Sequence, residues 1–296
     1  MSAVYKAVRR YAGPVRGLVM DFSGTTVDKY VIAPAVVFQE VFKKYGIDIT
    51  MSEARGPPGT MGLGKDLHIS ILLQQPDIKS KWEAKYGRPS TDNDVQEIYR
   101  DFIPMQLAVL RRYGTLLPNT KEILEGLRKE KNIKVGVSTG FNRAMADILI
   151  EEAKKQGFVF DATAAGDDCI NGARPKPNML YKNLDIMDVS PIQSVVKIDD
   201  SSAGIGEGLS AGCWTVGIAR WSTYMDINDL ADEAKLSPHQ LQEKLQRSRG
   251  ILGKAGAHYV INEITELPSV INDINARMKN GETPMDLHKV NDRKDL

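Results

Sequence analysis

The sequence has few cysteines, almost no net charge and no long apolar run. Its 296 residues include only two cysteines, Cys169 and Cys213, which are too few for a disulfide framework and favour a reducing, cytoplasmic location. The 39 basic residues nearly balance the 38 acidic ones, so the composition gives no support for a nucleic-acid or membrane partner. No apolar run approaches the ~20 residues that a membrane-spanning helix needs.

What the sequence does contain is typical of a globular α/β protein. Hydrophobic residues make up 42% of the chain, an ordinary value, and the length suits one large domain or two modest ones. The first 16 residues carry four basic side chains and no acid. We interpret them as a polar lead into the first strand rather than a mitochondrial presequence.

Short apolar runs alternate with helical patterns over most of the chain. This alternation predicts a doubly wound parallel sheet. Strands are expected at 15–20, 133–137, 158–162, 194–198, 214–218 and 258–261, the last at a sheet edge. Helices are expected at 119–129, 143–156, after Pro177, and at 203–211, 226–249 and 267–278, before a charged tail from residue 280.

One long stretch lacks strand patterns altogether. Between residues 31 and 113 the apolar residues follow helical spacing, at 35–46, 67–73, 94–99 and 104–112. We therefore predict a core domain of residues 1–30 and 114–296 with an inserted all-helical domain, residues 31–113.

Carboxylates follow two of the predicted strands. Asp21 comes directly after the first strand, and Asp199 and Asp200 follow the strand at 194–198. Ligands bind at the carboxyl ends of strands in an open parallel sheet, and carboxylate oxygens suit Mg²⁺. The pattern predicts a magnesium site with Asp21 as a candidate nucleophile.

Groups suited to an anion lie at the same predicted edge. The turn with Ser23 and Gly24 offers backbone N–H groups. Thr139 and Gly140 supply a hydroxyl and an open backbone amide, and Arg174 supplies a permanent positive charge. Each piece alone is more often a turn, a helix cap or a rigid loop. Their shared placement favours a phosphate-plus-metal site.

Four short motifs resemble the haloacid dehalogenase superfamily and, within it, the phosphonoacetaldehyde hydrolase (phosphonatase) family. They are Asp-Phe-Ser-Gly-Thr-Thr-Val-Asp from Asp21, Val-Ser-Thr-Gly ending at Gly140, Gly-Ala-Arg-Pro around Arg174, and Lys-Ile-Asp-Asp-Ser around Asp200. The resemblance spans residues 19 to about 267 and implies that the insert is a cap domain. It also implies a small phosphonate substrate, a Mg²⁺ cofactor and a homodimer.

Inside the insert, Met61-Gly-Leu-Gly-Lys-Asp-Leu-His68 resembles the segment that carries the family's Schiff-base lysine, here Lys65. Two other interpretations of Lys65 exist. A nucleotide-binding P-loop would need Ser or Thr after the lysine and a strand before the loop, and Asp66 follows instead. Lysines at helix starts are also usually solvated. His68, at i+3 from Lys65 on a helix, is a candidate proton shuttle or a packed residue, and Met61 lines the pocket or the core.

The resemblance implies P–C bond cleavage with Asp21 attacking phosphorus and Lys65 forming an imine. Mg²⁺ would bind Asp21, Asp200, the Ser23 carbonyl and Asp199, directly or through water, while Arg174 and Thr139 balance phosphoryl charge. Ser23 replaces the acid that P–O phosphatases carry there, which weakens the alternative of a phosphatase or sugar-phosphate mutase. Gly204 stands where some relatives have a further acid, and Phe141 where some have tyrosine.

Overall fold

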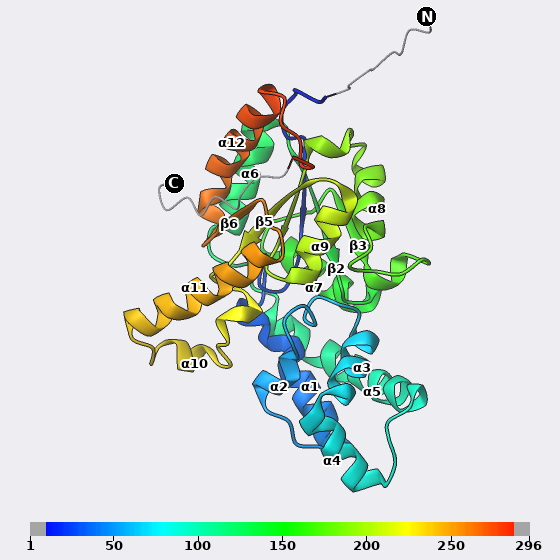
Figure 1. Ribbon diagram of the computed structural model, residues 1–296. Helices are drawn as coiled ribbons and strands as arrows, with labels where there is room; N and C mark the ends of the chain where they lie inside the picture. The colour runs from blue at the N-terminus through cyan, green and yellow to red at the C-terminus, as the bar shows by residue number, and fades with distance from the viewer. Residues whose placement is uncertain (1–9, 287–296) are drawn as a thin grey trace, which may run out of the picture.

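The computed structural model describes residues 10–286, and its elements surround one parallel sheet (Figure 1). The beginning of the predicted basic lead and the end of the predicted charged tail lie outside the described residues. The six strands have the order β3-β2-β1-β4-β5-β6, and every neighbouring pair is parallel. Their bounds are β1 Gly17–Met20, β2 Lys134–Thr139, β3 Ala162–Ala165, β4 Val195–Asp199, β5 Trp214–Ile218 and β6 Tyr259–Ile261.

The central strand β1 is buried on both faces, which explains its continuous apolar sequence. Leu18 and Met20 belong to the apolar cluster that includes Leu124, Met145 and Ile271, whereas Val19 packs with Leu180 and Met187. Strand β1 pairs with β2 on one side and β4 on the other. The chain order reverses between β1 and β4, which is where an open α/β sheet binds its ligands.

Helices cover both faces of the sheet and also form a separate group at one end (Figure 1). The helices associated with the sheet are α6 Thr120–Lys131, α7 Arg143–Lys155, α8 Asn178–Met187, α9 Ser202–Ala211, α10 Leu230–Glu233, α11 Pro238–Lys254 and α12 Leu267–Lys279. Short 3-10 turns are η2 Arg111–Tyr113, η3 Gly166–Asp168, η4 Ile192–Ser194, η5 Thr223–Met225 and η6 Ile264–Glu266.

The predicted helical insert is helical throughout its described elements. It contains α1 Ile32–Lys44, α2 Met51–Arg55, α3 Lys65–Gln74, α4 Pro76–Tyr86 and α5 Asp92–Leu110, and η1 Lys29–Val31 leads into it. Capping boxes at Thr50 and Thr91 start α2 and α5. Phe38 of α1 packs against Phe102 of α5 with ring centroids 4.6 Å apart, so aromatic burial joins helices that are distant in sequence.

Three sequence predictions about elements were wrong in detail. The two helices expected at 94–99 and 104–112 form one helix, α5, with Pro104 inside it, because burial of Phe102 and Leu110 outweighs the cost of the proline. The strand expected at 158–162 starts only at Ala162, where it first pairs with β2. The helix expected at 226–249 is divided into α10 and α11, since Ser237 forms a new capping box.

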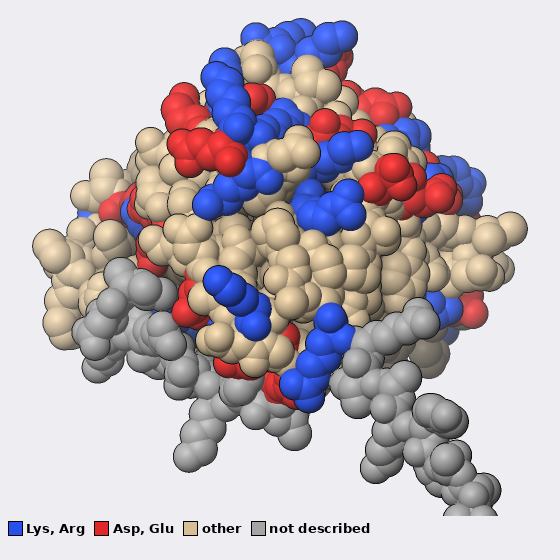
Figure 2. Space-filling model, turned by 90° about the horizontal axis from the view of Figure 1, so that it is seen from above, with Lys and Arg blue, Asp and Glu red and all other residues tan. Residues whose placement is uncertain are grey.

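The face of the molecule seen from above in Figure 2 lies at the end opposite the insert. Lysines and arginines alternate there with aspartates and glutamates, and uncharged surface lies between them. This mixed pattern agrees with the nearly neutral composition. Among the described helices, none has both the length and the apolar character to cross a membrane.

Candidate active site

Asp21 lies at the carboxyl end of β1, where the strand gives way to a tight turn. Its backbone N–H still donates to Ile198 O of β4 at 3.0 Å. The Phe22 carbonyl then accepts the N–H groups of Thr26 and Val27 at 2.8 and 2.9 Å. Burial raises the pKa of the Asp21 carboxyl to about 6, an effect that nearby Asp199 strengthens and Arg174 opposes.

Gly24 allows the second carboxylate to come close to this turn. Its φ of 80° lies in the left-handed region, and a Cβ there would be 2.5 Å from the Asp200 carboxyl carbon and 2.9 Å from Val31. Gly24 therefore leaves room for Asp200. It does not line the pocket described below, so its predicted role toward phosphate stays a prediction.

Asp199 and Asp200 follow β4 and are held differently. Asp199 Oδ1 accepts hydrogen bonds from Ser201 N and Oγ at 3.0 and 2.7 Å. Asp200 Oδ2 accepts the Thr223 N–H at 3.1 Å, and its backbone carbonyl accepts from Ser222 Oγ at 2.7 Å. Burial, followed by repulsion from Asp199, raises the Asp200 pKa well above its usual range.

The three aspartates form a candidate metal site. Asp21, Asp199 and Asp200 are buried, and each offers a carboxylate oxygen within 4.8 Å of the others. Three hard oxygen donors packed this closely repel one another unless a cation lies between them.

Arg174 joins the nucleophile position to a buried ion network beneath it. Its Nη2 lies 2.7 Å from Asp21 Oδ1 and 3.2 Å from Asp199 Oδ2, and its Nε lies 3.0 Å from Glu207 Oε2. Lys197 Nζ contacts Asp199 Oδ2 at 2.9 Å and Glu207 Oε2 at 3.5 Å. Burial lowers the pKa of Arg174, but the surrounding carboxylates outweigh it and the net shift is upward.

This network carries an excess of negative charge. In its ion pairs two cations, Arg174 and Lys197, face three buried carboxylates, those of Asp21, Asp199 and Glu207. The Asp200 carboxyl lies beside this network, with an oxygen within 4.8 Å of carboxylate oxygens of Asp21 and Asp199. Sequence reasoning missed Glu207 and gave Lys197 no role, although a lysine within a buried strand is itself a signal, because lysine is rarely buried unless paired.

Gly204 is explained by the position of Asp199. A Cβ on Gly204, in the first turn of α9, would overlap the Asp199 carboxylate. The acid that some relatives carry at this position is therefore sterically incompatible with Asp199 as it lies here.

Lys65 is the first residue of α3 and lines the same pocket as Asp21. It is one of two residues of the insert that were predicted to act in catalysis, the other being His68. The Nζ of Lys65 lies 5.1 Å from the ring centroid of Phe141 and 5.9 Å from that of Phe38. Burial lowers the Lys65 pKa to about 8, while Asp21 partly opposes this shift. With this pKa about a tenth of the amine is unprotonated at pH 7, far more than for an ordinary lysine.

The pocket between sheet and insert is small, with a volume of about 20 Å³. Seven of the predicted site residues line it, from both parts of the molecule: Asp21, Ser23, Met61, Lys65, Thr139, Gly140 and Asp200. The other lining residues are Phe141, which the sequence singled out as a replacement of tyrosine, and four residues without a predicted site role, Val31, Pro34, Gly62 and Ser201. Most of them are apolar or small and carry no chemical signal in the sequence.

Thr139 and Gly140 bring the core up to the insert. Thr139 Oγ1 accepts the Phe141 N–H at 3.2 Å. A Cβ on Gly140 would lie 2.5 Å from Gly62 O and 2.7 Å from Leu63 O, so the absence of a side chain lets the loop before Lys65 approach the sheet edge.

His68 lies next to the pocket but not on its wall. It is fully buried, its ring centroid is 4.1 Å from that of Phe38, and its Nε2 lies 3.0 Å from Ala54 O. Because a carbonyl only accepts, Nε2 carries the proton, and Nδ1 finds no hydrogen-bond partner among the residues that the structure describes. Burial and then Lys65 lower the His68 pKa well below its usual value. Its predicted proton-shuttle role stays a prediction.

The remaining expectations concern the P-loop and the cysteines. The chain before Lys65 consists of α2 and a turn rather than a strand, which excludes the P-loop interpretation. Cys169 and Cys213 are both free.

Comparison with known proteins agrees with this fold and site. Residues 15–212 match the haloacid dehalogenase-like hydrolase family, and the chain belongs to this family. The chain is 37% identical to a phosphonoacetaldehyde hydrolase of Klebsiella pneumoniae subsp. pneumoniae over 279 residues, 91% of this chain and 99% of that protein. It is 38% identical to one of Bacillus cytotoxicus over 257 residues, 87% of this chain and 95% of that protein. At this level of similarity the chain belongs to the phosphonoacetaldehyde hydrolase family.

Solved structures give the same result. A phosphonoacetaldehyde hydrolase-like protein from Oleispira antarctica superposes with a TM-score of 0.90 at 35% identity, covering 95% of this chain and all of that chain. A β-phosphoglucomutase from Clostridium difficile reaches 0.60 at 18% identity, covering 89% of this chain and 98% of that chain, and shows the shared fold alone.

Proposed function

We propose that this enzyme hydrolyses the P–C bond of phosphonoacetaldehyde, giving acetaldehyde and phosphate. The observation that carries the proposal is the placement of Lys65, a buried amine of lowered pKa, in one pocket with the Asp21 carboxylate. A phosphatase needs no such amine. Cleavage of a P–C bond does, because a bare carbanion is too poor a leaving group.

The first proposed step uses Lys65. Its neutral amine adds to the substrate aldehyde, and loss of water with uptake of one proton gives an iminium. The rings of Phe38 and Phe141 flank the amine, so the nitrogen is shielded from bulk water while it reacts. Met61 and Val31 complete the apolar part of the pocket wall.

The second step uses Asp21. Its carboxylate attacks phosphorus, the P–C bond breaks, and the bonding electron pair moves toward the iminium nitrogen to leave an enamine. Arg174, Thr139 and backbone N–H groups near Ser23 and Gly140 are proposed to balance charge on the phosphoryl group. Water then hydrolyses the aspartyl phosphate, and protonation and hydrolysis of the enamine release acetaldehyde and regenerate Lys65.

The aspartates fit a magnesium ion. We propose Asp21, Asp200 and the Ser23 carbonyl as ligands, with Asp199 acting through water because Ser201, Lys197 and Arg174 already contact its oxygens. A bound Mg²⁺ would supply the positive charge that offsets repulsion between the Asp21 carboxylate and an anionic phosphoryl group. Chelation should abolish turnover and added Mg²⁺ should restore it, as measured by phosphate release. Full activity in metal-free buffer would contradict the proposed magnesium site.

A comparison of two substrates tests the function itself. Phosphonoacetaldehyde and 2-oxoethyl phosphate both carry the aldehyde and differ by the bridging oxygen. We expect release of acetaldehyde and phosphate from the phosphonate, and little hydrolysis of the ester, because Ser23 cannot protonate a leaving oxygen as an acid would. The reverse preference would assign a phosphatase or sugar-phosphate mutase.

Residues 31–113 are proposed to act as a cap that closes over the core, residues 1–30 and 114–296. We also propose a homodimer and a cytoplasmic location. The family resemblance supports the dimer, and the two free cysteines fit a reducing compartment. Sedimentation equilibrium tests the dimer, which should have twice the mass of one chain.

A further inference from the structure

Arg55, the last residue of α2, is a buried arginine of the insert whose hydrogen bonds leave the insert. Only 6% of the surface of this residue is exposed. Nη1 donates to Tyr30 O at 2.6 Å and to Thr223 Oγ1 at 2.9 Å, and Nη2 donates to Ile227 O at 2.8 Å. These three acceptors all lie outside residues 31–113.

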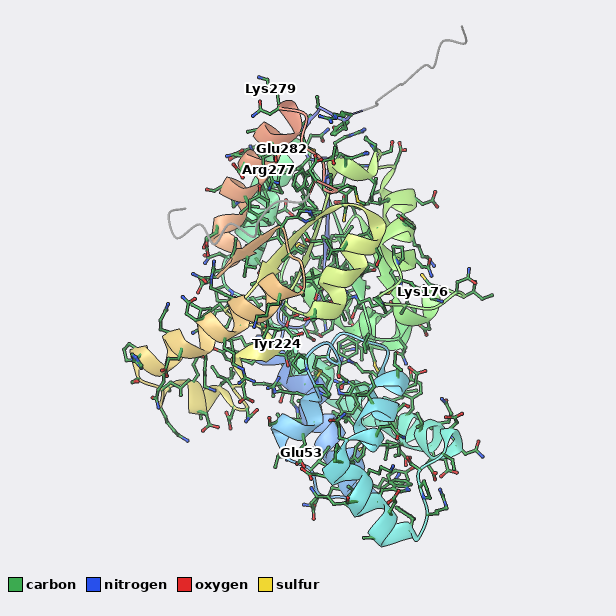
Figure 3. All side chains as sticks on the ribbon, in the orientation of Figure 1. Glu53, Lys176, Tyr224, Arg277, Lys279 and Glu282 are labelled. Carbon is green, nitrogen blue, oxygen red and sulfur yellow. The ribbon has the colours of Figure 1, made fainter. Side chains whose placement is uncertain are left out.

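The segment that Arg55 contacts also holds Asp200. Thr223 donates its N–H to Asp200 Oδ2, and the preceding Ser222 donates its hydroxyl to the Asp200 carbonyl. Tyr224 accepts the Ser202 N–H at 3.0 Å through its phenolic oxygen. Figure 3 shows Tyr224 where the core meets the insert, above Glu53 of α2. The segment 222–224 therefore holds Asp200 and the chain that follows it.

Two hydrogen bonds thus connect the insert to a proposed metal ligand. Arg55 bonds the Thr223 side chain, and the Thr223 backbone fixes the rotation of the Asp200 carboxylate. A planar guanidinium can reach several acceptors at fixed angles. A buried cation also loses much free energy if it loses its partners, so Arg55 holds this segment firmly when insert and core are together.

We propose that Arg55 is a positioning residue that couples closure of the insert to the geometry of Asp200 through Thr223. The proposal rests on the proposed function only in taking Asp200 as a magnesium ligand. When the insert separates from the core, Arg55 leaves Thr223 and Asp200 loses its fixed orientation. The metal site is then fully formed only in the closed enzyme.

The test is the affinity of the full-length protein for MgCl₂, measured by isothermal titration calorimetry. Arg55→Lys keeps the charge but cannot match the three acceptors, and Thr223→Val removes the hydroxyl while keeping the backbone N–H. Each should weaken Mg²⁺ binding about 10-fold, the lower end for residues that orient metal ligands. The double variant should bind Mg²⁺ no more weakly than the weaker-binding single variant. Both changes break the same path of hydrogen bonds from Arg55 through Thr223 to Asp200.

Two variants serve as matched controls. Thr223→Ser keeps the hydroxyl and should bind Mg²⁺ like the wild type. Arg88→Lys changes an arginine whose bonds, to both oxygens of Asp94 at 2.7 Å, stay inside the insert, and it should not alter the affinity. A purely structural role for Arg55 would lower the melting temperature but leave the Mg²⁺ affinity of the folded protein unchanged.

The outcomes separate this inference from the function. Unchanged Mg²⁺ affinity in Thr223→Val and Arg55→Lys, or full additivity in the double variant, overturns the coupling even if the wild type cleaves the phosphonate. Should Arg55→Lys not fold, the contrast between Thr223→Val and Thr223→Ser decides. A wild type that neither binds Mg²⁺ nor cleaves the phosphonate overturns the proposed function as well.

Discussion

At the residue scale, the environment of Lys65 differs from that of Lys197, another buried lysine. Lys197 has carboxylate partners at short distances, which keep a buried ammonium stable. Lys65 instead lies near two aromatic rings, and its pKa falls to about 8 mainly because of burial. The first environment suits a structural cation and the second a nucleophilic amine.

The lowered pKa predicts the pH dependence of catalysis. Only the unprotonated amine adds to the aldehyde, so kcat/KM should rise with pH, about tenfold per unit below the pKa, and level off above about pH 8. An ordinary lysine would extend the rise to roughly pH 10.4. The measurement is a pH series of initial rates at saturating Mg²⁺. A flat profile between pH 6.5 and 9 would show that Lys65 deprotonation does not limit the reaction.

At the element scale, the end of β2 and the loop before α3 fit together because Gly140 has no side chain. Gly140→Ala would place a Cβ against backbone carbonyls of residues 62 and 63, which cannot rotate away as a side chain could. The loop should move outward and carry Lys65 with it. Since a displacement of ~1 Å can cost about 100-fold in rate, we expect a loss of that order in kcat/KM with the fold retained.

Gly126→Ala is the matched control. Gly126 lies inside α6, and a Cβ there meets no atom within 4 Å. This variant should keep full activity and gain about 0.5–1 kcal/mol in the free energy of unfolding, because alanine favours helix. The measurements are steady-state kinetics and urea denaturation. Normal activity of Gly140→Ala would mean that the loop does not need its present position.

The sequence predicted those parts of the molecule that depend on local pattern. The strand ends carrying Asp21, Thr139 and Asp200 were predictable, because apolar runs ending in polar residues mark both the element and its edge. Arg55 and Glu207 were not, since their roles arise from contacts across more than 30 residues of chain. The single helix through Pro104 was missed for a related reason, as tertiary packing overrides the local preference of proline.

At the scale of the whole molecule, the pocket lies between two parts of the chain, the core and the insert. The pocket of about 20 Å³ has room for little more than water. The first connection into the insert also holds three non-glycine residues, Asp28, Tyr30 and Val31, at φ of 55°, 63° and 55°. Such conformations cost on the order of 1–3 kcal/mol each, and all three lie at the junction between core and insert.

We therefore predict that the angle between insert and core differs between the empty and the ligand-bound enzyme. Closure would exclude water from the iminium, and opening would admit substrate. Crystal structures without ligand and with a non-hydrolysable phosphonate analogue would measure the angle. The same open arrangement in both would contradict a mechanism in which Lys65 and Asp21 act in one pocket.

The most direct test of the account is to trap the imine on Lys65. Acetaldehyde and borohydride together should place an ethyl group on this amine and inactivate the enzyme, and peptide mass mapping should find the label in the segment from Met61 to His68. Lys65→Arg, which keeps the charge but forms no imine, should escape labelling and lose phosphonate cleavage while retaining its fold and Mg²⁺ binding. A label located elsewhere, or normal turnover by Lys65→Arg, would contradict the imine mechanism and favour a phosphatase.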